Sequence, residues 1–154
     1  MTFPTTEWLV GNKIVLMSGE LGSLANNAVA VGPAFNNSQG NAGSGFMYAD
    51  VQLEAIFAGS PAANTGVNLY FLESQDGVNF ENLTVSGLVP NRAPDLVFPV
   101  YQIANPSGQR INLLTQLPWG TWKPMIYNNG TGQAFIAQSS VLSIRPATIQ
   151  LPNA

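Results

Sequence analysis

Residues 46–58, FMYADVQLEAIFA, decide the fold. Apolar side chains occupy every second position from Met47 onward, and the residues between them include Tyr48, Asp50, Gln52 and Glu54. This alternation is typical of a β-strand with one buried and one solvated face, because successive side chains of a strand point to opposite faces. A helix would scatter the same apolar residues around its cylinder. The stretch therefore predicts a strand.

Further short strands are expected along the rest of the chain, separated by turn-forming residues. Asp76-Gly77 and the Asn-Gly segment 128–132 are examples, since Asn and Gly tolerate positive φ. Pro99 lies inside one expected strand, which predicts a sheet edge or a bulge there. The expected strands cover residues 13–18, 46–58, 67–71, 80–85, 95–103, 109–116, 122–127, 134–137 and 141–145.

Eight to nine short strands without a convincing long helix predict an all-β fold. We expect an antiparallel β-sandwich, jelly-roll-like in its connections. A chain of 154 residues suits one domain. We assign residues 13–146 to this domain, residues 1–12 to an extended N-terminal arm and residues 147–154 to a C-terminal tail.

The low content of charged residues bears on function. Only 8% of the residues are Asp, Glu, Lys or Arg, whereas a typical domain has about 25%. Like-charge repulsion helps to keep proteins monomeric, so this surface repels neighbours weakly. A neutral secreted protein is one interpretation. A protein whose surface is largely covered by partners is the other, and it is the one we favour.

Composition also argues against several classes of function. The chain has no Cys and no His, so disulfides and thiolate zinc sites are excluded and the commonest general base is missing. A net charge of −3 without a basic patch argues against nucleic-acid binding. No apolar run approaches the ~20 residues of a membrane span. The polar segment 11–13 interrupts the first apolar residues, so we expect no signal peptide. We also expect no association with a membrane and no cofactor.

The carboxylates do not predict an active site. Asp50 and Glu54 share one face of an expected strand, but their Cα atoms would lie roughly 13–14 Å apart, and glycosidase carboxyl groups lie about 5–9.5 Å apart. Glu73, Asp76 and Glu81 surround a turn that could hold Ca²⁺. Their spacing lacks the density of a calcium loop, which favours a plain hairpin turn. We therefore expect no enzyme.

Both ends of the chain are unusually apolar. Disordered termini are usually polar and charged, so we expect arms that lie along a neighbouring subunit. Together with one tryptophan from a turn, the apolar residues of the arms form the candidate partner interface: Phe3, Trp8, Leu9, Trp119, Ile149 and Leu151.

A surface for sugars is a rival hypothesis. Aromatic rings that stack on a sugar, with amide groups beside them, occur between residues 119 and 129. The competing interpretation is that Trp122 belongs to the core and Trp119 caps a turn. The platform would consist of Trp119, Trp122, Tyr127, Asn128 and Asn129.

Several segments, in this order, resemble small virion proteins encoded among the structural genes of tailed bacteriophages. They are GELGSLANNAVA (19–30), LYFLESQDGVNFEN (69–82), RAPDLVFPV (92–100), LPWGTWKPMIYNNGTGQAF (117–135) and VLSIRP (141–146). They resemble turn and core signatures and carry over no functional residues. The N-terminal arm has no counterpart in the pattern.

This resemblance implies a β-sandwich component of a virion, with a position on the capsid surface. We expect a capsid decoration (cement) protein, assembled in the host cytoplasm, whose partner is the major capsid protein. A homotrimer would match three neighbouring capsid subunits at local threefold positions. A tail, collar or fibre protein, or a carbohydrate-binding module that attaches virions to cells, remains the alternative.

Overall fold

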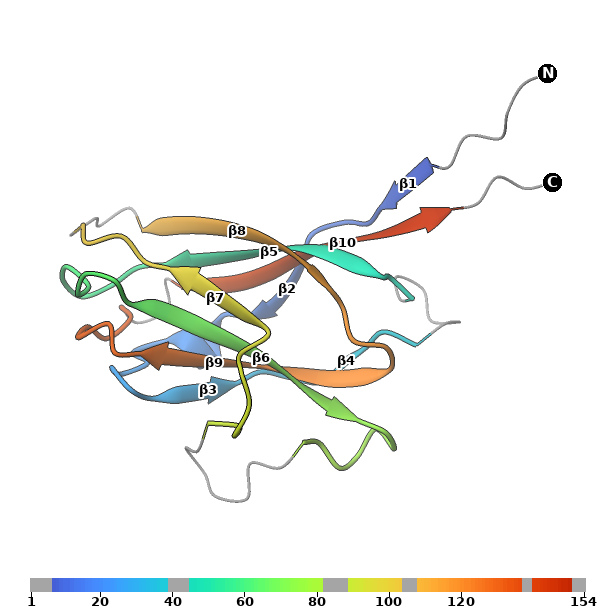
Figure 1. Cartoon of the computed structure of the whole chain (residues 1–154), viewed down its shortest axis with the longest axis horizontal. Helices are drawn as coiled ribbons and strands as arrows, with labels where there is room; N and C mark the ends of the chain where they lie inside the picture. The colour runs from blue at the N-terminus through green and yellow to red at the C-terminus, as the bar shows by residue number, and fades with distance from the viewer. Residues whose placement is uncertain (1–6, 39–44, 82–88, 104–107, 137–139, 151–154) are drawn as a thin grey trace.

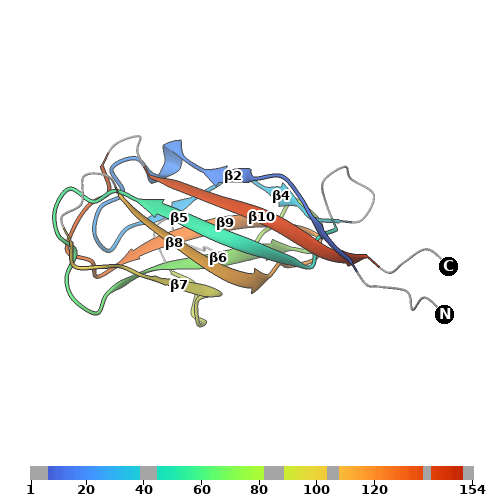
Figure 2. The same ribbon diagram turned by 90° about the horizontal axis from the view of Figure 1, so that it is seen from above.

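The computed structural model describes residues 7–38, 45–81, 89–103, 108–136 and 140–150. Two antiparallel sheets lie face to face, and the only helical element in these ranges is one short 3-10 turn, η1 (Gly19–Leu21) (Figures 1 and 2). The expected all-β sandwich is confirmed.

Each sheet has five strands, one of which pairs beside the main order. The first sheet has the order β1-β10-β5-β8, with β2 also on β10; the strands are β1 (Glu7–Val10), β10 (Val141–Gln150), β5 (Tyr48–Ala55), β8 (Gln109–Gln116) and β2 (Ile14–Met17). The second sheet has the order β3-β9-β6-β7, with β4 also on β9; the strands are β3 (Val29–Val31), β9 (Thr121–Asn129), β6 (Gly66–Ser74), β7 (Leu96–Pro99) and β4 (Phe35–Asn36).

The core lies between the sheets. The alternation predicted for β5 is confirmed, because Val51 and Leu53 are fully buried while the residues between them face outward. The second sheet contributes Phe71 and Trp122, whose rings meet edge to face at 4.8 Å. Such aromatic pairs stabilise a core beyond the area they bury.

Pro124 lies inside β9, where a proline has no N–H for the ladder. The N–H of Gly32 donates to the carbonyl of Pro124 at 2.8 Å, so the proline nitrogen faces the same side. That side is the gap between β3 and β4, where no donor is needed. A Cβ on Gly32 would come within 2.6 Å of the Met17 side chain, so only glycine fits this close approach.

Some expected strands differ in the structure. β8 has the predicted bounds. β7 is an edge strand, as Pro99 predicted, but it covers only Leu96–Pro99 of the expected strand 95–103. Phe80 and Glu81 are not in a strand, and residues 82–85 lie outside the described ranges. In place of the expected strand 134–137, the described part of this segment makes a single bridge, Phe135 to Phe57.

Described residues of the connection after β6 pack on the outer face of the second sheet. Tyr70, Leu72 and Met125 form a small buried cluster there, and Phe80 and Val89 pack on it. The return strand predicted after Asp76-Gly77 is absent up to Glu81. One backbone bond joins this segment to β6, from the N–H of Glu81 to the carbonyl of Glu73 at 2.8 Å, and at Phe71 the side chains of Arg92 and Asp95 occupy the edge that a return strand would pair with.

The expected arms pair with each other. Residues 7–10 form β1 and lie antiparallel to residues 147–150 of β10, from Glu7↔Gln150 to Val10↔Ala147. β5 follows β10 only as far as Ala147↔Tyr48. Beyond that point two strands leave the sandwich together (Figures 1 and 2). We call β1 and residues 147–150 the terminal ribbon.

Candidate functional site

Exposed apolar side chains gather at the end of the sandwich from which the terminal ribbon leaves. They are Trp8 (60% exposed), Leu9 (51%), Met47 (44%), Trp119 (60%) and Ile149 (41%). We call this surface the ribbon end. It contains four of the six residues of the candidate interface, and the other two, Phe3 and Leu151, lie outside the described residues.

Sheet register brings these residues to one end. Tyr48, the first residue of β5, lies opposite both Ala147 of β10 and Gln116 of β8. The N–H of Leu117 donates to the carbonyl of Met47 at 2.9 Å. The start of β5, the end of β8 and the base of the terminal ribbon therefore meet.

An open hollow of about 660 Å³ lies at this meeting point. Met47, Trp119 and Ile149 line it together with Glu73 and Asp95. The structure thus places Trp119 and Ile149, from the candidate interface, around the same hollow.

The terminal ribbon is apolar on both faces. Trp8 lies opposite Ile149, and its ring meets that of Tyr48 edge to face with centroids 5.8 Å apart. Leu9 points to the other face, because neighbouring residues of a strand alternate. No charged side chain lies between residues 8 and 10.

Trp119 is held outside by a loop with fixed backbone. The side-chain nitrogen of Asn37, which is fully buried, donates to the carbonyls of Phe46 (2.8 Å) and Pro118 (3.0 Å). Its oxygen accepts hydrogen bonds from the backbone N–H groups of Gly45 and Phe46, both at 3.0 Å. The N–H of Asn37 donates to the carbonyl of Gly120 at 2.7 Å. These bonds hold the backbone on both sides of Trp119, so the indole is presented by an ordered loop.

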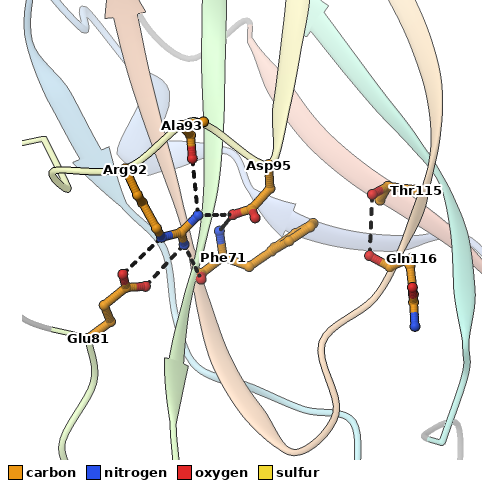
Figure 3. A network of polar contacts seen from close by, with 7 residues as sticks. All are labelled: Phe71, Glu81, Arg92, Ala93, Asp95, Thr115 and Gln116. Atoms are coloured by element: carbon orange, nitrogen blue, oxygen red, sulfur yellow. Dashed lines mark hydrogen bonds and ion pairs between the residues drawn. The ribbon is translucent and has the colours of Figure 1, made fainter.

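An arginine network lies beside the hollow (Figure 3). The Arg92 guanidinium donates two bonds to Glu81, at 2.8 and 3.0 Å, and one to Asp95 at 3.0 Å. The bond with Glu81 is the main cause that raises the pKa of Arg92 above its usual value. Bidentate pairs of this kind are the stronger form of ion pair.

This network replaces a missing strand. β7 pairs with β6 only up to Leu96↔Leu69, so the backbone of Phe71 faces an open edge. The Phe71 N–H donates to the Asp95 carboxylate at 2.7 Å, and the Phe71 carbonyl accepts from Arg92 at 2.9 Å. Side chains thus satisfy the groups that a neighbouring strand would pair with.

Glu54 is also engaged in ion pairs. Glu54 forms ion pairs with Lys13 (3.4 Å) and Arg110 (3.6 Å) on the outer face of the first sheet. Among the residues that the structure describes, no group of three or more acidic side chains is placed to hold a metal ion. Glu54, Glu81 and Asp95 thus each form an ion pair with a basic side chain.

Asp76 closes the turn after β6. Its carboxylate accepts bonds from the backbone N–H groups of Val78 (2.8 Å) and Asn79 (2.7 Å), from the Asn79 side chain and from the Ser74 hydroxyl. These bonds, above all the one from the Asn79 backbone, hold the pKa of Asp76 well below its usual range. The carboxylate is thus engaged within its own turn.

The residues of the rival sugar platform are dispersed, and Trp122 belongs to the core, as the competing interpretation predicted. Trp122 is fully buried between the rings of Phe35 and Phe71. Asn128 is also fully buried and donates to backbone carbonyls of Leu24, Ala25 and Gln133. Trp119 alone retains the exposed position that a stacking surface needs.

Two important residues were missed at the level of sequence. The alternation assigned Met47 to the buried face, but β5 begins one residue later, so the side chain reaches the ribbon end. Asn37 lies in a Gly- and Asn-rich segment, and nothing in the sequence distinguishes a buried asparagine there from an exposed one.

Comparison with known proteins finds no matching family model, curated protein or solved structure. The resemblance to phage virion proteins therefore stays a prediction. No helix in the described part of the chain is long and apolar enough to cross a membrane.

Proposed function

We propose that this chain is a non-enzymatic structural component of a virion, a decoration (cement) protein that binds the outer surface of a phage head. The observation that carries the proposal is the ribbon end, where Trp8, Leu9, Met47, Trp119 and Ile149 are all exposed. Its partners are the major capsid protein and further copies of the chain itself.

The physical chemistry of the ribbon end suits a protein partner. Met47, Trp119 and Ile149 lie around one hollow, and exposed apolar side chains grouped in this way mark interaction surfaces. Tryptophan often carries a large share of the binding energy in such surfaces. Because the loop around Trp119 is already ordered, binding loses less conformational entropy there. An interface of roughly 1,200–2,000 Å² is enough for stable association.

Strand order adds support at the level of the fold. With β1 and β2 counted as one strand and β3 and β4 as another, eight strands remain. Their orders, β1/β2-β10-β5-β8 and β3/β4-β9-β6-β7, are those of two interlocked Greek keys, so we infer a jelly roll. Capsid and lectin domains both use this architecture, which makes it supporting analogy and no more.

A carbohydrate-binding module is the second candidate. The hollow beside Trp119 also receives Glu73, Gln116 and Thr148. An indole with a carboxylate, an amide and a hydroxyl nearby offers both stacking and hydrogen bonds to a neutral sugar. A tail, collar or fibre protein belongs to the same structural class as the first proposal and differs in position and copy number.

Binding of the purified full chain to expanded, undecorated phage heads tests the proposal. We expect saturable binding, measured by co-sedimentation, with many copies on each head. Host polysaccharide serves as the comparison ligand. If the chain does not bind to heads but binds the polysaccharide, this result would overturn the decoration role and favour the second candidate.

A further inference from the structure

We propose that the outer edge of β1 pairs with β1 of a second copy of this chain, antiparallel and about a twofold axis at Leu9. The inference goes beyond the proposed function, which names further copies of the chain as partners but no contact between them. A twofold pair takes the place of the homotrimer that the resemblance implied, and head binding does not depend on it. It rests on the backbone direction of β1, on the exposed side chains of the terminal ribbon and on the register that a self-pair would have.

The backbone of β1 has an open edge. The N–H of Gly11, directly after β1, donates to the carbonyl of Pro146 at 2.7 Å. Alternate residues of a strand direct their backbone groups to the same side. The backbone N–H and C=O groups of Leu9 therefore face β10, and those of Trp8 and Val10 face away from it. Among the described residues, β1 pairs with β10 alone.

Two open edges of the second sheet are closed by local devices. β7 ends at Pro99, which cannot donate to a further strand. The open part of β6 is occupied by Arg92 and Asp95. The segment from Trp8 to Val10 has neither a charge nor a proline. An unprotected edge with apolar side chains invites pairing with another chain.

A pair of β1 strands is self-complementary in one register. With Leu9 opposite Leu9 of the second copy, each Trp8 lies opposite a Val10. The outward backbone groups then form four hydrogen bonds in two reciprocal pairs. Aromatic and β-branched residues stabilise each other when they are opposite across strands. No like charges are opposed, because Glu7 would lie opposite Gly11.

The position of the terminal ribbon leaves room for the second copy. β1 leaves the sandwich together with the end of β10 (Figures 1 and 2). In an antiparallel pair about Leu9, the two sandwiches extend in opposite directions from the joined strands. The contact is therefore isologous and closes as a dimer.

Cysteine cross-linking tests the register directly. The natural chain has no cysteine, so a Leu9→Cys variant has one thiol. Leu9 and its symmetry mate form a pair without mutual hydrogen bonds, with Cα atoms about 4.5 Å apart, within the disulfide range of about 4.4–6.8 Å. We expect nearly complete disulfide dimers under mild oxidation. Leu114→Cys, at a 73% exposed position of β8 outside the terminal ribbon, is the control and should cross-link poorly.

Introducing a charge at Leu9 provides a second test without covalent chemistry. Leu9→Lys and Leu9→Glu each place like charges across the axis, and each should weaken the dimer about tenfold. A mixture of the two variants should restore the dimer in light scattering. A wild-type chain that is monomeric at all concentrations, or an odd-numbered oligomer that the charge variants leave intact, would overturn the pairing. Head binding by such a monomer would leave the proposed function standing, so the two failures are distinguishable.

Discussion

The carboxylate of Asp76 shows how one side chain can stabilise a turn that carries no other function. Four donors surround it, and Gly77 follows in a left-handed conformation at φ +74°. The sequence pattern Asp-Gly predicted the turn and the role of the side chain. It could not predict that no strand forms between this turn and Glu81, because pairing partners are set by the rest of the sheet.

The lowered pKa of Asp76 makes stability depend on pH in a defined direction. A carboxyl whose pKa is depressed in the folded state stabilises the fold above its unfolded pKa of about 3.9, and this contribution is lost as the pH falls toward the folded value. We expect Asp76→Asn to lower the melting temperature at pH 6. The difference from the wild type should shrink below about pH 4. Thermal melts from pH 2 to 6 measure this, and a difference independent of pH would contradict it.

Trp119 and the buried Asn37, which holds its loop, mark the limit of inference from sequence. Trp119 was identified because a tryptophan in a turn segment stands out. Asn37 was not, because its role comes from burial and from four bonds to distant backbone groups. Such bonds join segments far apart in the chain, and local pattern contains no record of them.

At the scale of elements, local pattern predicted strands better than pairing. β8 has the predicted bounds because its alternation and flanking turns are clear. The terminal ribbon was expected as two separate arms, since apolar residues without a period do not reveal a partner. β1 pairs with the end of β10 because the two strands lie side by side at the same edge, where their backbone N–H and C=O groups form hydrogen bonds with each other.

The Arg92 network is a replacement for a strand, and its removal should expose the β6 edge. We expect Arg92→Ala to lower the free energy of unfolding by about 2 kcal/mol, since the Phe71 carbonyl and the Glu81 carboxylate lose their donor. Aggregation on warming should increase as well. Urea denaturation and light scattering measure the two effects.

Arg110→Ala is the matched control for this variant. Arg110 also forms an ion pair, but its side chain is 73% exposed and the distance to Glu54 is 3.6 Å. An exposed pair contributes roughly 0–1 kcal/mol. Equal losses in the two variants would contradict the role of Arg92 as an edge cap.

At the scale of the whole molecule, low charge and apolar ends belong together. With 8% charged residues, the surface has few means of keeping neighbours apart. Phe80 and Val89 pack on the outer face of the second sheet, whereas the apolar side chains of the ribbon end are exposed. A molecule built in this way suits a lattice, where contacts with other chains cover what the monomer leaves exposed.

The measurement that tests this account most directly compares the binding of two variants, Trp119→Ala and Tyr101→Ala, to undecorated phage heads. Trp119 and Tyr101 are both 60% exposed, but Tyr101 lies beside Gln109, at the opposite end of β8. We expect Trp119→Ala to weaken binding about thirtyfold, as for an interface hot spot of about 2 kcal/mol, and Tyr101→Ala to bind like the wild type. Equal affinity of both variants and the wild type would contradict the ribbon end as the binding surface.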